Sequence, residues 1–143
     1  MGAWRRVAGL VISVGFLCGC SKQASATDDL IQALGEAHSA VASSILALEL
    51  YGQQRSTRAV TETVIGDMTE QIVDAERALE PVSVEDERIQ ADRDAASAAI
   101  HAGVTALLTS RDELKQRGAV GNTDDLASAG RQVDSLLSEL RGG

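Results

Sequence analysis

The sequence predicts an all-α protein built as an antiparallel, up-down-up-down four-helix bundle. Apolar residues recur at spacings of three and four in four successive segments, and no segment shows the sustained alternation of a β-strand. Short connections that contain glycine or proline separate these segments. We expect the bundle to cover residues 28–141 and to fold as a monomer without a disulfide or a metal.

The first predicted helix runs from about residue 28 to 51, with Thr27 as its N-cap and acidic residues in its first turn. If the helix continued past Gly52, Arg55 would fall on its core-facing line, so the glycine indicates a turn. A single long bent helix is the alternative, because no proline enforces the break. The predicted core positions are Leu30, Leu34, Ala37, Val41, Ile45 and Leu48, flanked by Ile31, Leu46 and Leu50.

The second predicted helix covers about residues 57–80 and stops at Pro81, which lacks a backbone donor and disfavours the helical conformation of the residue before it. Ile65 and Val73 are expected at the flanks of its apolar stripe. The stripe itself consists of Val60, Val64, Met68, Ile72, Ala75 and Leu79.

The third predicted helix follows Ser83-Val84-Glu85-Asp86, which is similar to a capping box with Asp in the fourth position. It runs to about Arg117, and Gly118 supplies the stop. Arg93 is in phase with the apolar stripe, so we expect its stem to pack at the rim while its charged end stays in water. The stripe consists of Ile89, Ala96, Ile100, Gly103, Leu107 and Leu114.

The fourth predicted helix begins after Thr123, where Thr-Asp-Asp-Leu repeats the pattern that starts at Thr27. Its apolar residues alternate spacings of four and three, the heptad pattern of a helix that packs along a seam. Three heptads are short for a free coiled coil, so we expect this helix to pack within the domain. The heptad positions are Leu126, Gly130, Val133, Leu137 and Leu140.

The N-terminus has the order of a secretory signal: Arg5 and Arg6, an apolar run from Val7 to Leu17, and a polar chain from Ser21. The run is about half of the roughly 20 apolar residues that cross a bilayer, so we do not expect a permanent transmembrane helix. An ordinary signal peptide with a soluble secreted product is one interpretation of this segment.

The residues that close the run, Leu17-Cys18-Gly19-Cys20, favour a second interpretation. This stretch resembles the lipobox of bacterial lipoprotein precursors, although Cys18 stands where Ala, Ser or Thr is commoner. The resemblance implies that residues 1–19 are a cleaved lipoprotein signal peptide. It also implies that Cys20 becomes the acylated first residue, which anchors the protein to the cell membrane or outer envelope, outside the cytoplasm. We expect the small polar segment at residues 20–27 to be a flexible tether.

The composition of the chain that begins at Cys20 limits the classes of partner that we expect it to bind. Loss of Arg5 and Arg6 takes the formal charge from −8 to about −10, which disfavours nucleic acid and anionic headgroups as partners. Cys20 is the last cysteine in the sequence, so this chain cannot form an internal disulfide. Tyr51 is its one aromatic residue, which lowers the expectation of a small-molecule pocket.

Candidate catalytic and metal-binding residues fail simple spacing tests. A di-iron bundle pairs each histidine with a carboxylate three residues earlier. Gly35 precedes His38 and Ala98 precedes His101 at that distance, so we expect both histidines at solvent-facing flanks. No Gly-x-Ser-x-Gly elbow or phosphate-binding loop is present. We therefore expect no enzyme activity, no cofactor and no metal.

The most unusual segment after the tether is the small-residue run at 95–103. Close packing inside the bundle is the favoured interpretation, and the alternative is a partner-binding surface at Ala95, Ala98 and Ala102. The leading functional hypothesis is a non-enzymatic envelope lipoprotein that binds another envelope protein or serves as a structural accessory. An extracytoplasmic bundle that binds or senses a small ligand is the alternative.

Overall fold

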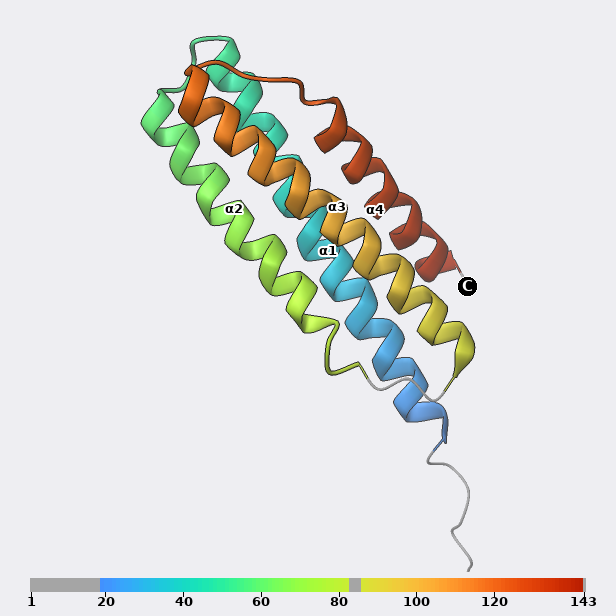
Figure 1. The fold of residues 1–143 in the computed structure, drawn as a ribbon. Coiled ribbons are helices and arrows are strands. Elements are labelled where there is room, and N and C mark those ends of the chain that lie inside the picture. Colours follow the sequence, from blue (N-terminus) through green and yellow to red (C-terminus); the bar gives the residue numbers. More distant parts are fainter. Residues whose placement is uncertain (1–18, 83–85, 143) are drawn as a thin grey trace, which may run out of the picture.

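The computed structural model describes residues 19–82 and 86–142, and this part of the chain is an all-α bundle (Figure 1). Its helices are α1 (Gly19–Gly52), α2 (Arg58–Ala78), α3 (Glu87–Arg117) and α4 (Asp124–Gly142). No strand occurs within these described ranges. The predicted fold class, four amphipathic helices packed against one another, is confirmed.

Each helix lies antiparallel to its neighbour in sequence, and α4 returns to lie against α1 (Figure 1). The diagonal pair α1 and α3 also make contact, whereas α2 and α4 do not within the described residues. Gly103 of α3 explains why the diagonal helices α1 and α3 come close enough to make contact. A methyl group there would lie 2.7 Å from Cδ1 of Ile72 in α2 and 3.4 Å from Cγ2 of Val41 in α1. The absence of a side chain therefore lets three helices meet.

The start of α1 differs from the sequence-based expectation. The segment at residues 20–27, predicted to be a flexible tether, belongs to α1, and Thr27 is inside the helix rather than at its N-cap. Ala26 is buried, one helical turn before the fully buried Leu30 and on the same face. Packing of this alanine carries the helix beyond the acidic residues that resemble a first turn.

The connection between α1 and α2 is a genuine turn, so a single long bent helix is wrong. Gln54 adopts a positive φ of 57°, and the amide of Arg55 bonds back to the carbonyl of Leu50 at 2.8 Å. Thr57 then caps α2, because its side-chain oxygen accepts from the amide of Val60 at 3.3 Å. The predicted break at Gly52 is confirmed.

The first half of α2 buries a different face from the one predicted. Thr61, Ile65 and Thr69 are buried, whereas Val60 is 56% exposed and Val64 is half-buried. The threonine hydroxyls are satisfied within the helix: Thr61 donates to the carbonyl of Thr57 at 3.0 Å, and Thr69 donates to that of Ile65 at 2.6 Å. Burial therefore leaves neither of these two threonine hydroxyls without a partner.

The second half of α2 follows the predicted stripe. Ile72, Ala75 and Leu79 are buried, and Met68 packs against the core from a half-buried position. The helix ends at Ala78, and the turn that follows contains Pro81.

At the start of α3, Asp86 is the N-cap and accepts from the amide of Arg88 at 2.8 Å. The predicted capping box placed Asp86 inside the first turn, which is wrong, and Ser83 lies outside the described residues. Arg93 is half-buried at the rim, as expected. Gly118 ends the helix with a left-handed φ of 64°. All predicted stripe positions of α3 are buried: Ile89, Ala96, Ile100, Gly103, Leu107 and Leu114.

α4 begins near the predicted residue, and its start is supported by a side chain that the motif did not suggest. The Oδ1 atom of Asn122 accepts from the amide of Asp124 at 2.9 Å, and the carbonyl of Thr123 accepts the first helical bond. On the heptad seam, Gly130 and Leu140 are half-buried. The buried seam residues are Leu126, Val133 and Leu137.

Among the described residues, no helix has the length and apolar character needed to span a membrane.

Candidate functional site

The candidate lipidation site, Cys20, is the second residue of α1. Leu17 and Cys18 of the lipobox lie outside the described residues, as does the remainder of the signal segment. The anchor therefore stays a prediction from sequence. In the structure Cys20 belongs to the same helix as Ala26 and Leu30, which are buried in the core.

His101 lies on the surface between α3 and α2. Its side chain is 70% exposed, and its Nδ1 atom is 3.0 Å from Oε1 of Glu76. An exposed pair of this kind contributes little to stability because water screens both groups. The contact connects two helices at their solvent edge and leaves the histidine accessible.

His38 lies between α1 and α4. Its Nδ1 atom is covered and has no hydrogen-bond partner in the described part of the chain, and the nearest carboxylate oxygen, Oδ1 of Asp134, is 4.0 Å away. The side chain as a whole is 44% exposed. The two histidines lie on different helix pairs. Over the ranges 19–82 and 86–142, no three His, Cys, Asp or Glu residues are placed to hold a metal ion.

The small-residue run of α3 divides between two faces. Ala96, Ala99 and Gly103 are buried in the core, which matches the packing interpretation for that half of the run. Ala98 and Ala102 are exposed, which places them where a partner could reach. Ala95, the third candidate surface residue, is half-buried beside them.

The exposed line of α3 extends beyond the alanines, farther than the small-residue run in the sequence indicates. Thr105 and Thr109 continue it, and both are exposed. The hydroxyl of Thr105 donates to the carbonyl of His101 at 3.0 Å, and that of Thr109 donates to the carbonyl of Thr105 at 2.9 Å. Both hydroxyl protons are therefore used within the helix. Ala91, two turns before Ala98, is also exposed. We define the α3 outer face as Ala91, Ala98, Ala102, Thr105 and Thr109.

A groove of about 470 Å³ runs between the end of α2 and the start of α3. Its cations already have local partners: Arg77 lies 2.6 Å from Asp74, and Arg93 lies 3.1 Å from Asp94. A ligand that binds in the groove would therefore have to compete with these carboxylates for the two arginines. The residues that line the groove are Val73, Glu76, Arg77, Leu79, Glu80, Arg93, Asp94 and Ser97.

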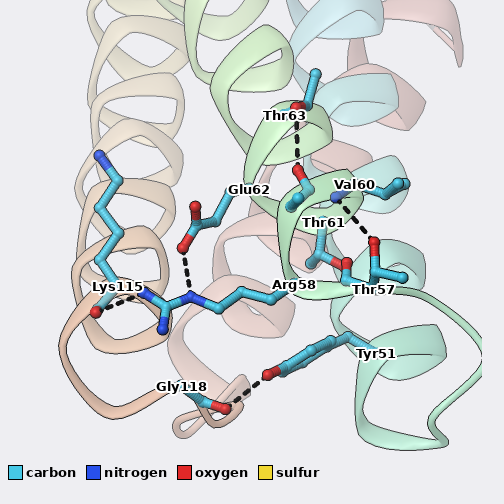
Figure 2. Close-up of polar contacts among 10 residues, drawn as sticks. Tyr51, Thr57, Arg58, Val60, Thr61, Glu62, Thr63, Lys115 and Gly118 are labelled. Atoms are coloured by element: carbon cyan, nitrogen blue, oxygen red, sulfur yellow. Dashed lines mark hydrogen bonds and ion pairs between the residues drawn. The ribbon is translucent and has the colours of Figure 1, made fainter.

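The opposite end of the bundle is closed by hydrogen bonds that join three helices (Figure 2). Tyr51 donates its hydroxyl to the carbonyl of Gly118 at 2.6 Å, which connects α1 to the cap of α3. Arg58 of α2 donates through Nη2 to the carbonyl of Lys115 and through Nε to Glu62, each at 2.7 Å. Tyr51, the one aromatic residue after Cys20, therefore has a structural role. We call this region the Tyr51 end of the bundle.

No protein-family model, no curated protein and no solved structure matches this chain.

Proposed function

We propose that this chain is a lipid-anchored protein of the bacterial cell envelope whose helical bundle acts by contact with another envelope protein, without catalysis. Acyl chains on Cys20 attach it to the membrane, and its lipobox supports this part of the proposal. Two or more chains are needed for stable attachment, because one chain binds only marginally.

The α3 outer face is the observation that carries the contact part of the proposal. Its side chains are small, and the hydroxyls of Thr105 and Thr109 donate to their own helix. A partner helix can approach such a surface closely, because interaxial distance depends on the side chains at the contact. Desolvation of these five side chains is also inexpensive, since three are apolar and both hydroxyls already donate within the helix.

Substitution of the two cysteines tests the anchor. Cys20→Ala should release the protein from membranes or leave an uncleaved precursor, whereas Cys18→Ala is the matched control and should remain lipidated. The mass of the purified protein and its sedimentation with membranes are the measurements. Lipid found on Cys18, or an unmodified Cys20 in the native protein, contradicts the assignment.

Site-specific crosslinking in the host tests the contact. A photoreactive residue at Ala98 should give a discrete adduct with one envelope protein. The same residue at Glu70, which is exposed on α2, is the control and should not give that adduct. Identical adducts from both positions would indicate nonspecific collision and would remove the α3 outer face from the proposal.

A small-ligand sensor remains the alternative, and the groove between α2 and α3 is the feature that favours it. Native mass spectrometry of protein purified from the host distinguishes the two functions. A retained small molecule that disappears in Glu76→Gln favours the sensor, and a retained protein favours the contact module.

A further inference from the structure

The distance between Cys20 and the folded core is short. Ala26 is 7% exposed and belongs to the core cluster, so six residue steps separate the cysteine from buried structure. In the helical conformation that they have in α1, these six steps span about 9 Å at 1.5 Å per residue. Even fully extended, they reach only about 21 Å. An anchor on Cys20 therefore cannot place the bundle far from the lipid that holds it.

The geometry of α1 also determines which end of the bundle is near the anchor. The start of α1 lies at the same end as the end of α2 and the start of α3 (Figure 1). Gly52 and the Tyr51 end lie about 40 Å farther along the helix axis, counted from Ala26. One end of the molecule is therefore close to Cys20, and the other is separated from it by the full length of the core.

Charge disfavours an orientation in which the outer face of α2 lies flat against an anionic bilayer. Asp67 and Glu70 are exposed along this face, and a flat orientation on it would bring them within a Debye length of about 8 Å from the headgroups. The end beside Cys20 is also acidic, with Asp28 and Glu87 exposed, but it is the narrow end of an elongated bundle (Figure 1). An upright bundle keeps most of its carboxylates outside the range of repulsion.

We propose that the first turns of α1 act as a short stem that holds the Ala26 end at the bilayer and points the Tyr51 end away from it. This inference rests on the lipidation of Cys20 proposed above. It also defines the partner. Ala98 lies about 17 Å above Glu87 along α3, so the partner must present its contact surface within about 40 Å of the membrane. A membrane-embedded or membrane-attached envelope protein meets that requirement.

Energy transfer to the bilayer tests the orientation in the lipidated protein. Glu87→Cys and Arg55→Cys each introduce one free thiol for a fluorescent donor, because the thiol of Cys20 is acylated. The labelled proteins are reconstituted in vesicles of phosphatidylethanolamine with a minority of phosphatidylglycerol and an acceptor lipid. We expect transfer from position 87 to exceed transfer from position 55 several-fold.

A matched control inserts about twenty Gly and Ser residues between Lys22 and Gln23, which makes a flexible linker with a root-mean-square length of about 25 Å. The insertion should largely remove the difference between the two positions. Equal transfer at positions 87 and 55 without the insertion overturns the stem, as does a difference that the insertion leaves unchanged. The mass of the labelled protein separates this failure from that of the proposed function: an acylated protein with equal transfer refutes only the stem, whereas a protein without acyl chains refutes the anchor.

Discussion

The hydroxyl of Tyr51 donates a 2.6 Å hydrogen bond to the carbonyl of Gly118, the left-handed residue that ends α3. The two residues belong to the diagonal pair of helices, and their contact secures the end of the bundle where α1 stops and α3 turns into the loop before α4 (Figure 2). The hydroxyl of Tyr51 is thus hydrogen-bonded to the backbone at the end of a neighbouring helix.

Removal of this hydroxyl tests the contact. Tyr51→Phe keeps the ring and should lower the free energy of unfolding by about 0.5–1.5 kcal/mol, because one hydrogen bond is lost. Urea unfolding followed by circular dichroism measures the change. An unaltered unfolding midpoint would mean that water replaces the bond at no cost.

A methyl group at Gly103 tests the close approach of three helices. Gly103→Ala should destabilise the protein by about 1–2 kcal/mol, because its Cβ would lie 2.7 Å from Cδ1 of the fully buried Ile72. Gly66→Ala is the matched control, since the added carbon would have no atom within 4 Å apart from its chain neighbours and the nearby backbone of α2. That control should gain about 0.5–1 kcal/mol from helix propensity. Equal effects at the two glycines would contradict the packing.

The two faces of the small-residue run in α3 predict opposite responses to arginine. Ala98→Arg should change the free energy of unfolding by no more than about 0.5 kcal/mol, because the side chain enters solvent. Ala99→Arg should cost at least about 3 kcal/mol, because it overfills the core and buries a charge at a position that is 0% exposed. Thermal melts of the two variants measure the difference. A large loss of stability in Ala98→Arg would place that residue inside the bundle and remove it from the proposed contact surface.

The buried threonines of α2 offer a fourth test. Thr69→Val should leave stability unchanged or raise it by up to about 1 kcal/mol. The carbonyl of Ile65 keeps its helical bond, while the buried hydroxyl becomes a methyl group. Val60→Thr, at a position that is 56% exposed, is the control and should be close to neutral. Destabilisation by more than about 1 kcal/mol in Thr69→Val would show that the hydroxyl has a further role.

The sequence alone determined the number of helices and most of their boundaries. The turn after Gly52 and the stop at Gly118 follow from backbone chemistry, and the stripe of α3 follows from a 3.6-residue period that is strong enough to specify its buried face. The division of the 95–103 run between core and surface did not follow in the same way, because every residue in it is small enough for either environment.

Only the tertiary structure decided the rotation of α2 and the start of α1. Valine and threonine have similar shapes, so the period accommodates a stripe through Val60 or one through Thr61, about 100° apart around the helix. In the folded bundle Thr61 lies on the same buried face as Ile65 and Ile72, and its own helix satisfies the hydroxyl. Arg58, at the edge of this face, donates to the carbonyl of Lys115 in α3. Ala26 likewise becomes a helical core residue through long-range packing. The local periodicity of the sequence cannot predict such contacts, because they join residues that are distant in the chain.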